Sequence, residues 1–229
     1  MVVQTPLMDG VACGGTTLSE RSRALVAQAW PLLALALALR VGEILATPHW
    51  TAVADPADYI RHAVSIANGH GMAESVIAQG GPSALRPPAY PYLLGAVFAV
   101  TGDSETAGRL VSALLGVVTV ALIGLVADIL WSRRAALAAM AIAAVYPPLV
   151  LVSGTLISES LALPLMLGLL LLLLEYRGRP RPSWVGPAAG LIYALCLLDR
   201  PALSVLAVPL VAALWDRRAR GLAAARTAA

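Results

Sequence analysis

The sequence predicts an all-α, polytopic membrane protein, and three observations support this fold class. Hydrophobic residues make up 59% of the 229 residues, and charged residues only 13%. A soluble domain is about half apolar and about a quarter charged, so a soluble core cannot bury this much apolar surface. Long apolar runs recur along the chain at the length of membrane-spanning helices. Backbone polar groups in lipid must be bonded internally, which makes these runs helices.

The apolar runs predict six membrane spans. The first covers residues 24–46, and the others are expected at 106–130, 135–152, 159–174, 184–198 and 201–215. A further run at residues 88–100 is short for a span and is typical of an interfacial or re-entrant helix. Within the first span, Arg40 and Glu43 are three residues apart on one helical face, so they can pair.

Arginine clusters orient these spans. All sixteen basic residues are Arg, and positive charge accumulates in cytoplasmic loops. If residues 88–100 do not cross, every cluster beside a span lies on one side: Arg21 and Arg23; Arg133 and Arg134; Arg177, Arg179 and Arg181; Arg217, Arg218 and Arg220. The sequence therefore predicts a cytoplasmic tail at 1–23, a transmembrane module at 24–215 with an external loop at 47–105, and a cytoplasmic tail at 216–229.

Charge and cysteine content bear on which ligands the protein can bind. The basic pI of about 9.2 reflects cytoplasmic arginines and does not predict nucleic-acid binding. Cys13 and Cys196 lie in unrelated settings, so neither a disulfide nor a metal site follows from them. No cofactor is evident, and a divalent metal ion stays open.

Candidate catalytic carboxylates lie on the predicted outer side. Asp55 followed by Pro56 predicts a helix start, with Asp55 as the N-cap, and Asn68-Gly69 predicts the end of that amphipathic helix. A cap aspartate at the membrane boundary can also be catalytic. Glu159 opens an apolar helix, where a carboxylate is either a partner of the helix dipole or a site residue.

Candidate phosphate-binding cations lie on the same side. Arg86 and Tyr90 belong to the stretch Arg-Pro-Pro-Ala-Tyr-Pro, whose prolines fix an extended entry into the short helix. A cation beside an aromatic ring at the interface suits a lipid phosphate or serves as an interfacial anchor. Arg200, before a proline at another helix boundary, is a second candidate. His62 and His70 are weaker candidates, because a lone loop histidine is usually solvated.

These pieces, in this order, resemble the GT-C membrane glycosyltransferases. The nearest branch is glycosyltransferase family 39 with its relatives, the protein O-mannosyltransferases and the lipid A aminoarabinose transferases. The resemblance covers roughly residues 24–215. It rests on an Asp just after the first span and on the ordered stretches at 59–71, 86–91, 102–110, 153–159 and 199–201.

The resemblance implies an enzyme that transfers a sugar, with inversion, from a polyprenyl-phosphate-linked donor to a lipid, glycan or protein acceptor. It implies Asp55 as general base with Asp58 as second choice, and Glu159 as the second acidic residue of the site. The expected substrate-binding residues are Arg86, Tyr90, Arg200 and His70. The expected location is a bacterial-type plasma membrane, among membrane lipids, with the active side external.

Three alternatives stay open. Members of the family are expected to be longer, so the chain is expected to hold only the N-terminal module, as a truncated product, a fragment or half of a split enzyme. A non-catalytic membrane partner or lipid-binding scaffold would tolerate substitution of Asp55, Glu159 and Arg86. A transporter is less favoured, because no internal repeat is evident and the charges gather at the outer boundary.

Overall fold

The computed structural model of the chain describes residues 18–73, 75–76, 85–176 and 182–211, and the regular elements in these ranges are all helices. This confirms the all-α fold class. The predicted arginine clusters at 177–181 and 217–220 lie outside the described residues, as do most of the predicted tails. The elements are α1 (Leu18–Ala46), α2 (Asp55–Ala67), α3 (Ala89–Thr101), α4 (Glu105–Leu130), α5 (Arg133–Val145), α6 (Pro147–Gly154), α7 (Glu159–Glu175), α8 (Val185–Asp199) and the 3-10 helix η1 (Pro201–Leu206).

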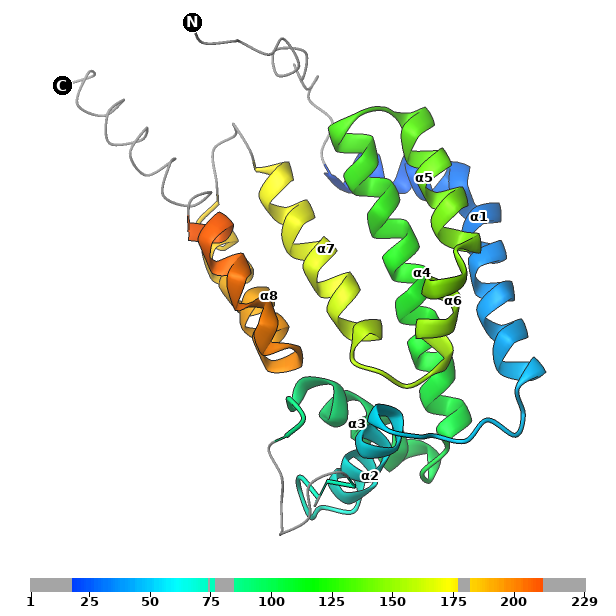
Figure 1. Cartoon of the computed structure of the whole chain (residues 1–229). Coiled ribbons are helices and arrows are strands. Elements are labelled where there is room, and N and C mark those ends of the chain that lie inside the picture. The colour runs from blue at the N-terminus through cyan, green and yellow to red at the C-terminus, as the bar shows by residue number, and fades with distance from the viewer. Residues whose placement is uncertain (1–17, 74, 77–84, 177–181, 212–229) are drawn as a thin grey trace, which may run out of the picture.

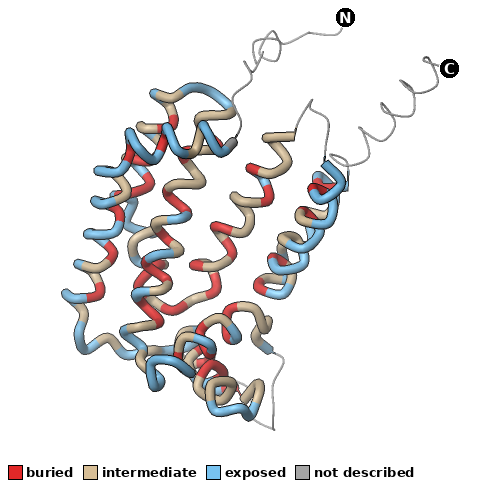
Figure 2. Tube along the Cα trace, turned by 180° about the vertical axis from the view of Figure 1, so that it is seen from behind, coloured by how far each residue is buried: buried red, intermediate tan, exposed pale blue. Residues whose placement is uncertain are grey.

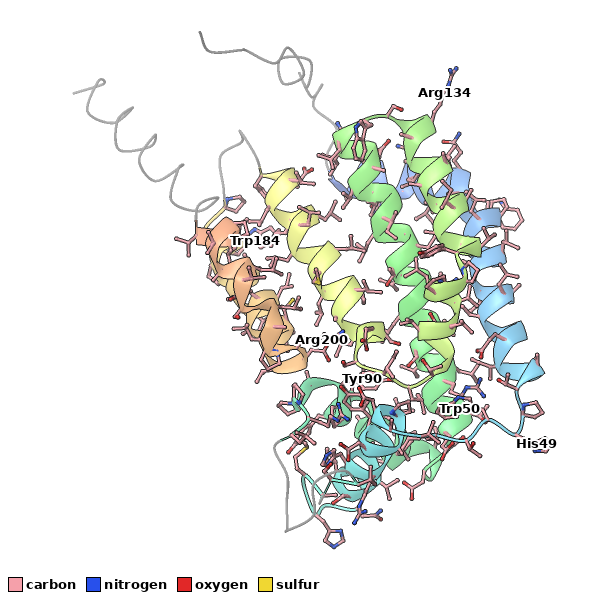
Figure 3. The ribbon with its side chains drawn as sticks, viewed as in Figure 1. His49, Trp50, Tyr90, Arg134, Trp184 and Arg200 are labelled. Atoms are coloured by element: carbon pink, nitrogen blue, oxygen red, sulfur yellow. The ribbon has the colours of Figure 1, made fainter. Side chains whose placement is uncertain are left out.

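The long helices form a bundle with α2 and α3 at one end. Figure 1 shows α1, α4, the α5–α6 pair, α7 and α8 running in alternating directions between the two ends of the bundle. We call the end that holds α2 and α3 the loop end. Arg200 lies at the loop end, and Arg134 lies at the opposite end (Figure 3). The helix alternation is the one expected if the short apolar helix α3 does not cross the membrane.

Within the described ranges, two helices are long and apolar enough to cross a membrane, namely Ser19–Ala46 and Glu105–Leu130. The α5–α6 pair, bent by 56° at its break, adds a third if it forms one span. The apolar helices α3, α8 and Pro201–Val211 are shorter. The structure therefore describes a helical membrane protein with two or three candidate spans, and the count of six stays a prediction.

A proline pair breaks the predicted span at 135–152 into α5 and α6. Because Pro148 has no N–H, the carbonyl of Ala144 lacks its helical donor. The buried guanidinium of Arg40 in α1 supplies one instead, with Nη1 3.4 Å from the Ala144 oxygen. Arg40 Nε also donates to the Ser153 hydroxyl at 3.1 Å. A side chain of α1 thereby joins the two sides of the break.

Glu43 pairs with Arg109 of α4, so the sequence-based pairing of Glu43 with Arg40 is wrong. Arg109 Nη2 lies 3.3 Å from Glu43 Oε1, and Arg109 Nε donates to the Gly154 carbonyl at 2.7 Å. The same guanidinium donates to the backbone and hydroxyl oxygens of Thr47. Arg109 thus links the ends of α1 and α6 to the start of α4 at the loop end of the bundle.

Among the described residues, three apolar clusters hold the helices together; the smallest joins α7, α8 and the segment after η1 through Leu169, Ala189 and Leu210, and the other two are larger. One joins α1, α4 and α5 far from the loop end, and Figure 2 shows buried positions on these facing surfaces and exposed positions along much of α8. The other attaches α2 and α3 to the bundle. Its buried members are Tyr59, Ala63, Tyr90, Leu94, Phe98 and Leu156. The second cluster positions the polar residues of the loop.

Candidate active site

The start of α2 differs from the sequence-based expectation. Asp55 is the first helical residue, Ala54 holds the N-cap position, and no side chain caps the helix. The prediction that Asp55 caps α2 is therefore wrong. Ala54 has a φ of 57°, a region that L-residues with a Cβ rarely adopt. The end of α2 is as predicted, with Asn68 as the C-cap and Gly69 at a φ of 79°.

Asp58, one turn into α2, is fully buried and is held by three donors. Its Oδ2 accepts hydrogen bonds from Arg86 Nε and from the Ser75 hydroxyl, both at 2.9 Å. Its Oδ1 accepts from the backbone N–H of Val76 at 2.8 Å. Burial alone would raise the pKa of Asp58, but the bonds from Arg86, Val76 and Ser75 outweigh it and hold that pKa below its usual range.

Arg86 joins the two aspartates of α2. While Nε bonds to Asp58, Nη2 lies 2.5 Å from Asp55 Oδ1. The guanidinium also stacks over the Tyr59 ring, 5.4 Å from its centroid. The Arg86 side chain is 14% exposed and that of Asp55 is 57% exposed. The cation is therefore fixed from one side by a buried carboxylate, while its second partner is open to solvent.

Tyr90 is buried under this cluster. Its ring meets that of Tyr59 edge to face, with centroids 5.2 Å apart, and its hydroxyl oxygen lies 3.0 Å from Ser112 Oγ of α4. The structure thus places Tyr90, expected to bind substrate, as a buried link between α2, α3 and α4. Its hydroxyl already has a partner.

A second ion pair joins the start of α7 to the end of α8. Arg200 Nη1 lies 2.7 Å from Glu159 Oε1, and both side chains are more than a third exposed. Both predicted cations are therefore paired with predicted carboxylates. The buried Leu156 and the adjoining Leu161 belong to the apolar cluster around Tyr59 and Tyr90. The start of α7 therefore packs against the aromatic residues that lie beneath Arg86.

The two histidines of the loop behave differently. His62 is fully buried, so the expectation that it is solvated is wrong. Its Nδ1 accepts the backbone N–H of Ala73 at 3.1 Å. This bond fixes the segment that also presents Ser75 and Val76 to Asp58. His70 is exposed beyond the end of α2, and the structure does not bring it to the Arg86 cluster.

Sequence reasoning gave no role to Arg109 or Asp199, which the structure buries. Both residues lie inside the ordered stretches, at 102–110 and 199–201, so their positions were a signal, but nothing in the sequence indicated that either side chain is buried. Within the described residues, no group of three or more His, Cys, Asp or Glu side chains is arranged to hold a metal ion.

An apolar groove of about 380 Å³ lies beside the site. It runs between α3, α7 and α8 and is lined by Pro88, Ala89, Tyr92, Leu93, Leu161, Leu165, Leu195 and Leu198. Its first residues follow Arg86 by only two positions.

The fold and the site define a class: a helical membrane protein with paired carboxylates and arginines at one end of its bundle, beside an apolar groove. The family model for dolichyl-phosphate-mannose-protein mannosyltransferase matches residues 85–227, and the chain belongs to this family. This confirms the resemblance to glycosyltransferase family 39. The match includes Arg86, Glu159 and Arg200 and begins after Asp55 and Asp58. Neither the curated proteins nor the solved structures gave a match to the chain.

Proposed function

We propose that the chain transfers a sugar from a polyprenyl-phosphate-linked donor to an acceptor hydroxyl at the outer face of the membrane, with inversion at the anomeric carbon. Membership of the family supports the donor class. The observation that carries the proposal is the Arg86 guanidinium between a buried and an exposed carboxylate. One residue would anchor the cation, and the other would be released for chemistry.

The lipid-linked sugar donor would bind with its polyprenyl tail in the apolar groove and its phosphate at Arg86. An arginine forms strong paired hydrogen bonds with a phosphate. Asp58 would retain Arg86 through Nε, and the phosphate would replace Asp55 at Nη2. Arg200, now paired with the exposed Glu159, is the second cation in reach of the negative charge.

Asp55, once released, would act as general base. The acceptor hydroxyl gives its proton to the Asp55 carboxylate while its oxygen forms a bond to the anomeric carbon. The bond from that carbon to the phosphate oxygen breaks, and its electron pair leaves with the polyprenyl phosphate. Arg86 and Arg200 stabilise the charge that develops on this leaving group. Glu159 would orient Arg200.

The proposed topology has six spans: α1, α4, the α5–α6 pair, α7, α8 and the segment that begins at Pro201. The end that carries Arg133 and Arg134 would face the cytoplasm, and the loop end would face outward. A bacterial-type plasma membrane suits this arrangement. The helices α7 and α8 are shorter than the roughly 20 residues of a typical span, so flanking residues would complete their crossing.

Replacement of the base tests the proposal. In membranes that contain the full chain and a radiolabelled polyprenyl-phosphate sugar, we expect Asp55→Asn to lower transfer by about 10²–10⁴-fold, the usual contribution of a general base. Asp103→Asn is the matched control, because Asp103 is an exposed aspartate at the same end of the bundle.

The control should transfer sugar at the wild-type rate. If Asp55→Asn also does so, the base role moves to Asp58 or the assignment fails. If substitutions of Arg86 and Glu159 also leave transfer at the wild-type rate, another protein in the membranes carries out the transfer and the chain acts as a non-catalytic membrane partner.

A further inference from the structure

Asp199 is a buried carboxylate without a hydrogen-bond partner. It is the last residue of α8 and is 1% exposed. Neither Oδ1 nor Oδ2 accepts a hydrogen bond in the part of the chain that the structure describes. Asp58, buried to the same degree, has three donors. Buried polar groups in native proteins are nearly always bonded, so an exception of this kind needs a cause.

In the part of the chain that the structure describes, no hydrogen-bond donor explains a carboxylate at this position. The C-terminus of a helix carries the negative end of the helix dipole, which repels an acidic side chain. The adjacent cation, Arg200, directs Nη1 to Glu159. An apolar side chain of similar size would fill this position without the cost of burying a polar group.

Asp199 lies where the groove meets the polar residues. Leu195 and Leu198, just before it in α8, line the apolar groove. The carboxyl interacts electrostatically with Arg200 and Glu159 and with Tyr59 and Tyr90. Figure 3 shows Arg200 and Tyr90 at this same end of the bundle.

We propose that Asp199 binds the sugar of the lipid-linked donor by accepting hydrogen bonds from two neighbouring hydroxyl groups. This inference rests on the proposed function and adds a sugar-recognition residue to it. A carboxylate has two oxygens that can accept two adjacent O–H donors at once. In the proposed binding mode, the polyprenyl chain of the substrate lies in the groove and its phosphate lies at the arginines. The sugar is then the part of the substrate that carries adjacent O–H groups. A buried acceptor left unpaired by a lipid without sugar would make recognition selective.

The test compares three lipids that differ only in whether they carry a sugar and in which sugar it is. The full chain in nanodiscs is titrated with polyprenyl phosphate, with polyprenyl-phosphate mannose and with polyprenyl-phosphate glucose. We expect the wild-type chain to prefer at least one sugar-bearing lipid. Asp199→Leu should lower that preference by about 10–100-fold and leave the affinity for polyprenyl phosphate within about twofold. Asp103→Asn should change neither affinity.

The outcomes separate the two proposals. If the wild-type chain binds none of the three lipids, the proposed function fails, and this inference fails with it. If it binds them and Asp199→Leu keeps the full sugar preference, or if the wild type shows no preference, only the role of Asp199 is overturned. Should the leucine variant not fold, Asp199→Asn decides. It keeps the shape and one acceptor, so we expect a partial loss of preference, and an undiminished preference would overturn the role.

Discussion

Asp55 and Asp58 lie three residues apart in α2, yet the two carboxylates differ in burial and in hydrogen bonding. Asp58 is buried and saturated by donors that hold its pKa low, which makes it a poor base and a firm anchor for Arg86. Asp55 shares the same cation but is 57% exposed, so an arriving phosphate can displace it. In the sequence, only the resemblance favoured Asp55 over Asp58 as the general base. The difference in burial and hydrogen bonding now gives a physical reason for that preference.

At the same scale, His62 makes the loop sensitive to acid. Burial lowers the pKa of His62, although Asp58 opposes this shift. The bond from Ala73 requires an unprotonated Nδ1. The stability from neutral His62 should be complete above pH ~6.5, the unfolded value, and be lost as the pH falls through the lower folded pKa. Thermal unfolding of the purified chain across this range measures the loss. His62→Asn keeps an acceptor but does not titrate, so its curve should be flatter; identical curves would refute the role.

At the scale of elements, the break between α5 and α6 depends on close packing around Arg40. A Cβ added at Gly116 of α4 would collide with the Ser153 hydroxyl and the Arg40 guanidinium. These atoms bond to each other and cannot move apart without loss of that bond. Gly116 is therefore a site where the absence of a side chain lets α4 approach α1 and α6.

Gly116→Ala should therefore destabilise the chain by about 1–3 kcal/mol, the usual cost of overpacking. Gly168→Ala is the matched control, because Gly168 lies in α7 with no atom within 4 Å of an added Cβ. That control should leave stability unchanged or raise it by up to about 1 kcal/mol, since Ala favours helix. Unfolding in detergent gives both values. An equal loss in the two variants would contradict the packing around Arg40.

Local signals in the sequence predicted the local elements. The Asn-Gly pair gave the end of α2, and the prolines after Arg86 gave the start of α3. Pro147 and Pro148 are a similar helix-boundary signal, but the sequence-based prediction placed them inside one continuous span at 135–152. Contacts over long separations could not be predicted. Arg40 meets Ser153 across 113 residues, and the burial of Asp199 depends on how α8 meets α3 and α7.

At the scale of the whole molecule, the bundle separates two chemically different ends. The two candidate phosphate cations and the carboxylates paired with them lie at the loop end, and Arg134 lies at the opposite end (Figure 3). The positive-inside rule assigns the second end to the cytoplasm. The proposed site would then face the side from which an external acceptor arrives.

Labelling with a membrane-impermeant maleimide tests this orientation. In a background with Cys13→Ser and Cys196→Ala, a Thr51→Cys variant in the exposed loop after α1 should react in intact cells. An Arg134→Cys variant, exposed at the opposite end, should react only after the membrane is permeabilised. The reverse pattern would place the site in the cytoplasm and overturn the proposed orientation.

The most direct test of the central claim is the anomeric configuration of the product. A polyprenyl-phosphate sugar of known configuration is incubated with the wild-type chain, and the linkage formed is determined by NMR. Because the acceptor oxygen attacks opposite the departing phosphate with one carboxylate as base, the product should have the inverted configuration. A product of retained configuration would exclude a single in-line displacement of the phosphate and would contradict the role proposed for Asp55 as its general base.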